Sequence, residues 1–355
     1  MLKKARPLEW LTFTLFLILL SGCTSPSEKD TDHDHGHDDD HGHEASSAEG
    51  TLTLPEIEAM SLTEGRLNVV ATTNIIGDVV AQVGQDTIDL TVLLGTNQDP
   101  HSYEATPSDL VALEQADLIF MNGWDLEEQL AETIEENFAD KMVQISAGVT
   151  PLNFGDDDEH GDEDHADEDD HDDHGHSGTD PHVWFSIHNV EIWVTNTSTV
   201  LQAADPENAE SYASNADAYL EELEVLETEV DQLMAQLPAE RRKLVTNHDS
   251  LGYFAADYDF EIVGTVIPAA STSAEPSASD LANLIEAMEK AGACTIFGET
   301  TQNDRLAQTV ADELSGCDSV EVIALYSGSL GDGAASSYTG MFLQNVENIV
   351  DGLGE

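Results

Sequence analysis

The chain has 355 residues, 40% of them hydrophobic, which is enough for two globular domains with ordinary cores. It carries 72 acidic against 11 basic residues, a formal net charge of −61. So few basic residues cannot build the positive patch that nucleic acid or an anionic lipid surface requires. At molar salt the Debye length falls to about 3 Å and an acidic surface no longer repels itself. The composition therefore indicates a halophilic acidic surface, with an ordinary acidic exported protein as the alternative.

The N-terminus has the pattern of an export signal. Basic residues within the first six precede an apolar run over 10–20, which is too short to span a bilayer core of about 30 Å. Leu20-Ser21-Gly22-Cys23 follows and resembles the lipobox of lipoproteins. We expect a signal peptide over 1–22 and Cys23 as the lipid anchor. The protein would then be exported and held at the outer face of the cytoplasmic membrane.

Two tracts rich in histidine and acid are expected to be disordered, because they contain too little apolar surface to fold. The first, 31–44, belongs to a tether over 23–66, and the second belongs to a loop over 156–177. The second tract holds five histidines: His160, His165, His171, His174 and His176. They are expected to bind metal weakly and raise its local concentration. The alternative is a solvated acidic linker whose histidines are incidental.

The segment 67–186 is predicted to form an N-terminal α/β lobe. Strands are expected over 67–73, 87–94, 117–122 and 142–145, alternating with helices over 75–83, 107–115 and 126–138. This alternation predicts a parallel sheet with helices on both faces.

Linking helices are predicted over 187–238. After a helix over 187–203, Asp205 is expected to be the N-cap and Pro206 the first residue of a second helix that ends near Leu237. Its apolar residues recur every three or four positions without a sustained heptad repeat. This pattern favours one long rigid helix between two lobes over a coiled coil.

The segment 239–355 is predicted to form a C-terminal α/β lobe. Strands are expected over 244–246, 262–267, 294–297 and 317–325, with helices over 250–256, 279–290, 302–314 and 336–353. Ligands bind at the carboxyl ends of strands in such sheets, so a site is expected in the cleft between the lobes.

Cys294 and Cys317 are an even pair in an exported protein, at the starts of two strands expected to be parallel neighbours. A structural disulfide between them is therefore expected. A paired-thiol redox role has little support, because the chain contains no Cys-x-x-Cys.

Three histidines lie outside the acidic tracts at the ends of predicted strands or the starts of helices. They are His101 in Asp99-Pro100-His101, His182 in Asp180-Pro181-His182, and His248. Proline restricts the backbone and holds the histidine that follows it. Three imidazoles suit zinc, and because neutral imidazole is the ligand, binding should weaken below pH of about 6. His188 is expected at the surface or behind the ligands.

Several motifs carry a resemblance to a known family over about 67–353. These are Asp99-Pro100-His101-Ser102-Tyr103-Glu104 with Pro107-Ser108-Asp109-Leu110, Ala116 to Gly123, Asp180-Pro181-His182-Val183-Trp184 after a charged histidine loop, His248 to Phe254, and Glu275-Pro276-Ser277. Together with the lipobox they resemble the zinc-binding lipoproteins of zinc ABC importers, in the cluster 9 (A-I) solute-binding group for zinc and manganese. The resemblance implies two α/β lobes joined by one long helix and the ligands His101, His182 and His248.

The chain departs from the family pattern at the fourth ligand. The resemblance implies an acidic residue in a turn before the last helix. Here the turn reads Tyr326-Ser327-Gly328-Ser329-Leu330-Gly331-Asp332. Glu299 is favoured as the fourth ligand because it ends a strand that should face the cleft, with Asp332 or water as alternatives. Glu299 could equally cap the following helix. Manganese members carry Glu in place of one histidine, so three histidines favour Zn²⁺ over Mn²⁺.

The expected function is that of a receptor that captures Zn²⁺ and delivers it, as a monomer, to the permease of an ABC importer with its ATPase. Alternatives are a manganese receptor of the same family, or a surface protein for cell adhesion or a metal chaperone with this fold. An enzyme is not expected. A zinc hydrolase is least favoured, because the chain has no His-Glu-x-x-His, and it has no nucleotide-binding Gly-x-x-x-x-Gly-Lys.

Overall fold

The computed structural model describes residues 51–61, 65–153 and 178–354, and the statements below concern these residues. The expected signal peptide over 1–22, the lipid anchor Cys23 and the tract 31–44 lie outside them. So do the five histidines of the second tract: His160, His165, His171, His174 and His176. Among the described helices, none has the length and apolar character needed to cross a membrane.

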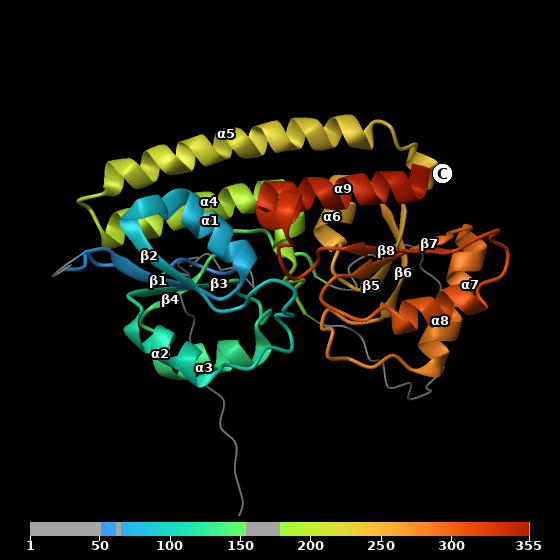
Figure 1. Ribbon diagram of the computed structural model, residues 1–355, viewed down its shortest axis with the longest axis horizontal. Coiled ribbons are helices and arrows are strands. Elements are labelled where there is room, and N and C mark those ends of the chain that lie inside the picture. The colour runs from blue at the N-terminus through green and yellow to red at the C-terminus, as the bar shows by residue number, and fades with distance from the viewer. Residues whose placement is uncertain (1–50, 62–64, 154–177, 355) are drawn as a thin grey trace, which may run out of the picture. The chain divides into compact units, whose positions relative to one another are not determined.

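The first lobe is built on a four-stranded parallel sheet in the order β2-β1-β3-β4. Its strands are β1 (Leu67–Ala71), β2 (Ile88–Val92), β3 (Leu118–Met121) and β4 (Met142–Gln144). The helices are α1 (Asn74–Gly84), α2 (Pro107–Gln115) and α3 (Glu128–Phe138). Every residue of β3 is buried, as expected of a central strand with helices on both faces (Figure 1).

The second lobe repeats this topology in the order β6-β5-β7-β8, again with parallel pairs. The strands are β5 (Lys243–His248), β6 (Glu261–Ile267), β7 (Thr295–Glu299) and β8 (Glu321–Leu325). The helices are α6 (Gly252–Asp257), α7 (Ala278–Ala291), α8 (Arg305–Glu313) and α9 (Tyr338–Gly354). The predicted pair of parallel-sheet α/β lobes is confirmed.

Two helices lie between the lobes in the sequence, α4 (Ile187–Ala204) and α5 (Ala209–Met234). The long helix α5 packs against α1 and α4 and against α9 of the second lobe (Figure 1). The prediction of Asp205 as its N-cap is wrong, because Asp205 is the C-cap of α4 and Asn208 precedes α5. Asp205 accepts hydrogen bonds from Asn208 Nδ2 at 2.7 Å and from Tyr212 Oη at 3.0 Å, which stabilise a turn between the two helices.

The largest apolar core is continuous between the lobes and the linking helices. It contains Phe120 of β3, Trp193 of α4, Tyr212 of α5, Phe254 of α6 and Phe342 of α9. Smaller apolar clusters lie under α2 and α3 in one lobe and under α7 and α8 in the other. The shared core gives the two lobes a common support, from which the loops that carry the site project.

Residues 51–61 do not behave as the predicted tether. Leu54, Ile57 and Met60 pack against the large core, and Met60 N donates a hydrogen bond to Ala204 O at 2.8 Å. These three apolar residues recur every three positions and cover part of the large core. Prediction of a disordered tether up to residue 66 is therefore wrong for 51–61.

Three consecutive basic residues donate hydrogen bonds to carbonyl groups at the C-terminal ends of three helices. Arg241 Nη1 donates to Leu353 O of α9 at 3.0 Å, and Lys243 Nζ donates to Ala291 O of α7 at 3.0 Å. Arg242 Nη2 donates to Met234 O, the last residue of α5, at 3.0 Å. Cations at helix C-termini satisfy free carbonyl groups and oppose the helix dipole. Three of the 11 basic residues of the chain thus serve as helix caps.

Cys294 and Cys317 form a disulfide with a Cα–Cα distance of 5.8 Å. Cys294 precedes β7 directly, whereas β8 begins only at Glu321, so the prediction that Cys317 begins a strand is wrong. Because β7 and β8 are parallel neighbours, the residues before them start from the same edge of the sheet. The bridge therefore ties the entries of two adjacent strands together.

Candidate metal centre

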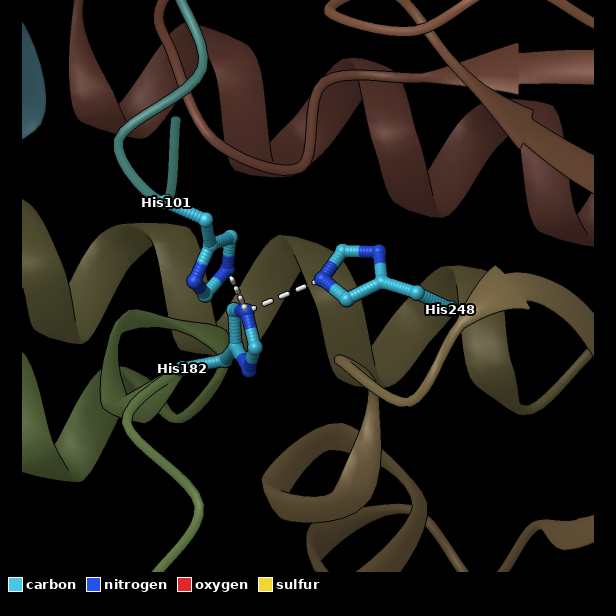
Figure 2. A group of neighbouring side chains, drawn as sticks. All are labelled: His101, His182 and His248. Atoms are coloured by element: carbon cyan, nitrogen blue, oxygen red, sulfur yellow. Dashed lines mark hydrogen bonds between the residues drawn. The ribbon is translucent and has the colours of Figure 1, made fainter. Parts of the chain in front are cut away.

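Three buried histidines converge where the two lobes meet. His182 Nε2 lies 3.1 Å from His101 Nε2 and 3.0 Å from His248 Nε2, and Figure 2 shows the three rings turned toward one another. The side chains are 4%, 1% and 2% exposed for His101, His182 and His248. They are the one group of possible metal-ligating side chains found among the described residues. His101 and His182 come from the first lobe and His248 from the second.

His101 is fixed by the turn that precedes it. It lies in the loop after β2, where Asp99 Oδ1 accepts a hydrogen bond from His101 N at 3.1 Å. An aspartate that accepts from the amide two residues later closes a local turn, and Pro100 between them restricts the backbone further. The side chain is thereby directed out of the loop toward the second lobe.

His182 repeats the same turn and adds a contact to its ring. Asp180 Oδ1 accepts from His182 N at 2.9 Å and lies 2.8 Å from His182 Nδ1. Asn122, directly after β3, donates from its side-chain Nδ2 to Pro181 O at 2.9 Å. Its main-chain N donates to Oε1 of the buried Glu127 at 2.8 Å. The peptide before His182 is thus held from the end of a central strand.

His248 is the last residue of β5 and owes its position to strand register. Thr246 of β5 pairs with Phe297 of β7, so residues two further on, His248 and Glu299, also lie side by side. Glu299 Oε1 makes a hydrogen bond with His248 Nδ1. Glu299 Oε2 accepts from Ser327 Oγ at 2.6 Å.

Each histidine therefore has a carboxylate beside Nδ1, the nitrogen that faces away from the centre. Glu128 Oε1 lies 3.5 Å from His101 Nδ1, and Asp180 and Glu299 contact the other two rings. A carboxylate at Nδ1 keeps the proton there and leaves the Nε2 lone pair free for a metal. Around a tetrahedral zinc ion with Zn–N of about 2.0–2.1 Å, ligand nitrogens lie about 3.3 Å apart. The observed separations are close to this value.

The two deepest histidines have opposite electrostatics. Burial lowers the pKa of His182 well below its usual value, and His248 and His101 lower it further. Burial also lowers the pKa of His248, but the adjacent Glu299 outweighs this and the net shift is upward. Burial raises the pKa of Glu299, yet His248 and hydrogen bonds bring it down to about 2. Burial raises the pKa of Asp180 well above its usual range.

A cavity of about 520 Å³ borders the cluster at His101. Trp124, Glu128, Pro181 and Ser271 also line it, so both lobes contribute to its wall. Trp124 and Glu128 have φ of 49° and 24°, in the left-handed region that costs a non-glycine residue about 1–3 kcal/mol. A strained backbone thus supports the carboxylate beside His101.

The predicted fourth ligand is not in the group. Both oxygens of Glu299 make hydrogen bonds away from the three Nε2 atoms, so Glu299 does not belong to the group in this structure. Nor is Glu299 the N-cap of the following helix, because Asp304 holds that position before α8. Asp332 is exposed before a 3-10 turn over Gly333–Ser336. His188 lies at the surface, 3.2 Å from Glu191.

The roles of Asp180, Glu128 and Asn122 were not identified from sequence. Asp180 had a usable signal, since an Asp two residues before a histidine can accept from its amide and reach its ring. Asn122 had a weaker one, a polar residue directly after the buried strand β3. Glu128 had none, because its contact depends on how the loop after β3 folds.

The chain is similar to known metal-binding proteins along most of its length. Zinc-binding protein TroA from Treponema pallidum is 30% identical over 297 residues, covering 82% of this chain and 90% of that protein. Manganese-binding lipoprotein MntA from Halalkalibacterium halodurans is 28% identical over 289 residues, covering 81% and 89%. The solved structure of the periplasmic zinc-binding protein TroA matches with a TM-score of 0.71 at 29% identity, covering 82% of this chain and 99% of that one.

A family model described as zinc-uptake complex component A, periplasmic, matches residues 69–352. This match spans both lobes, the linking helices and all three converging histidines. The family consists of solute-binding receptors and not of enzymes, which agrees with the sequence-based expectation. The chain belongs to the family of periplasmic zinc-uptake component A proteins.

Proposed function

We propose that this protein is the metal-capturing receptor of an ABC importer and that its cargo is Zn²⁺, held by His101, His182 and His248. The observation that carries the proposal is the convergence of three buried Nε2 atoms at 3.0 and 3.1 Å, each ring having a carboxylate at its other nitrogen. Three lone pairs directed at one point repel one another unless a cation lies between them. The site is therefore a cation receptor.

The donor set favours zinc. Manganese prefers oxygen ligands, whereas imidazole suits zinc, and the described ligand group contains imidazole alone. Manganese is the second candidate because several relatives of comparable similarity are named for it, including MntA from Halalkalibacterium halodurans. We assign the fourth position to a water molecule, since neither Glu299 nor Asp332 joins the group.

The division of the ligands between two lobes suits capture and release of a metal ion better than catalysis. Ligands divided between two lobes can separate, so the ion can be handed on without breaking a rigid cage. The proposed acceptor is a membrane permease with an ATPase on its other side. The receptor would act as a monomer at the outer face of the membrane, anchored through Cys23, and histidines of the acidic loop would bind further metal weakly.

Calorimetric titration of the full chain with Zn²⁺ and with Mn²⁺ tests this proposal. We expect one tight zinc site that is lost in His182→Ala and retained in the matched control His188→Ala, whose histidine is exposed on α4. Equal loss in both variants, or tight manganese binding with weak zinc binding, would refute the zinc assignment. Unchanged zinc accumulation in cells that lack the protein would refute the transport role.

A further inference from the structure

Contacts from two separate loops of the second lobe meet on Asp99 of the first lobe. Thr272 Oγ1 and Gln302 Nε2 both donate to Asp99 Oδ2, each at 2.6 Å. Thr272 follows β6 and Gln302 follows β7, whereas Asp99 lies in the loop after β2. One carboxylate oxygen of the half-buried Asp99 thus joins three loops that follow strands of two sheets.

The other oxygen of Asp99 holds the loop that carries His101. Asp99 Oδ1 accepts from His101 N at 3.1 Å, and Ser102 Oγ of the same loop donates to Oδ2 at 3.0 Å. The side chain that contacts the second lobe therefore also fixes the backbone of a converging histidine. A shift of either lobe would move or break this set of hydrogen bonds.

A second connection reaches the His101 ring from the residue next to Thr272. Ser271 Oγ donates to Glu128 Oε1 at 2.5 Å, and the same oxygen lies 3.5 Å from His101 Nδ1. Ser271 and Thr272 thus act on the same histidine, one on its ring through Glu128 and one on its main chain through Asp99. Asp180, which occupies the same place before His182, accepts no such pair of bonds from the second lobe among the described contacts.

Building on the proposed receptor function, we propose that Asp99 is a positioning residue that latches the His101 loop to the second lobe and so sets the rate of metal release. An ion held by histidines from both lobes leaves only when the lobes part, and parting breaks the bonds to Asp99. Hydrogen bonds to a carboxylate are about twice as strong as neutral ones. Differences in affinity among variants of one site arise mainly in the release rate.

The latch is tested by removing its second-lobe donors, which are not metal ligands. The full chain, loaded with one Zn²⁺, is mixed with excess EDTA and the rate of zinc transfer is followed by stopped flow. Thr272→Val keeps the shape of the side chain and removes the hydroxyl, and we expect release to become roughly tenfold faster. Gln302→Leu should act in the same direction, and the double variant should release zinc faster than either.

Ser102→Ala is the matched control, because it removes a donor to the same Asp99 oxygen without any contact to the second lobe. We expect its release rate to stay within about twofold of the wild type, because this bond lies within the His101 loop and does not break when the lobes part. Release from Thr272→Val and Gln302→Leu no faster than from Ser102→Ala overturns the latch. The latch is also overturned if the zinc-free variants unfold at a lower temperature while their rate of zinc release is unchanged. A wild-type chain that binds no zinc would instead refute the receptor function.

Discussion

His182 of the first lobe and His248 of the second make the same contact with a carboxylate, yet the two pairs differ in charge. Asp180 is fully buried and its Oδ2 has no hydrogen-bond partner in the described part of the chain. Glu299 accepts hydrogen bonds at both oxygens. Burial therefore raises the pKa of Asp180 and lowers that of His182, whereas Glu299 keeps its charge and raises the pKa of His248.

This difference separates two tasks within one site. The lowered pKa of His182 favours the neutral ring, which is the form that binds a metal. The raised pKa of His248 lets a proton compete with the metal for this ring up to a higher pH. His248 should therefore make metal capture more sensitive to pH than His182 does.

Removal of either ligand, His182 or His248, should reduce zinc affinity more than any other change. Structural zinc sites bind with about 10–16 kcal/mol in total, so the loss of one of three imidazoles should weaken zinc binding roughly 10²–10⁴-fold. His182→Ala should be more damaging than His248→Ala, because His182 Nε2 is the one in contact with both other rings. Competition titration against a chelator of known affinity measures both, and a larger loss in His248→Ala would contradict this order.

Neutralising the carboxylates should distinguish the two pairs. Glu299→Gln and Asp180→Asn should each weaken zinc binding about 10–100-fold, the usual cost of losing a partner behind a metal ligand. Only Glu299→Gln should also change how affinity depends on pH, because Glu299 is what holds the proton on His248. Zinc titrations of both variants between pH 5.5 and 8 provide the measurement, and an altered profile in Asp180→Asn alone would reverse the assignment.

Acid should weaken zinc binding through His248. A raised pKa means that the protonated form persists to higher pH, and a protonated ring cannot bind a metal. Affinity should therefore be constant above the raised pKa and fall about tenfold for each pH unit below it. Calorimetry in buffers of different ionisation enthalpy should detect the released proton. Binding that strengthens as pH falls would show that the sign is wrong.

The smallest effect on zinc affinity is expected at Ser327, which contacts Glu299 and not a histidine. Ser327→Ala removes a 2.6 Å hydrogen bond to Glu299 Oε2 and leaves the contact with His248 in place. Loss of such a bond should weaken zinc binding about threefold or less and lower the pKa of His248 correspondingly little. The ring signals of His248 in an NMR titration report both, and a change as large as that of Glu299→Gln would mean that Ser327 controls the pair.

The strands and the positions of the histidines could be predicted from the sequence because both follow local rules. The alternation of apolar strands with amphipathic helices predicted the two sheets, and strand ends with Asp-Pro-His predicted where His101 and His182 lie. The start of α5 was misplaced because Asp205 and Pro206 have the signature of a helix start but form a turn through Asn208 and Tyr212.

The carboxylates could not be assigned in the same way. Glu299 was correctly placed at a strand end facing the site, but which histidine nitrogen it meets depends on the register between β5 and β7. The two Asp-Pro-His segments have the same local turn, yet Asp180 contacts a ring whereas Asp99 contacts the second lobe. Such differences arise from packing between distant segments, which no local pattern encodes.

The most direct test of the metal centre is anomalous diffraction from crystals of the zinc-loaded protein, recorded at the zinc and manganese edges. We predict one strong zinc peak at about 2.0–2.1 Å from the Nε2 atoms of His101, His182 and His248, with Asp180 and Glu299 still at the Nδ1 atoms of His182 and His248. A peak coordinated by Glu299, or placed away from the three histidines, would contradict it.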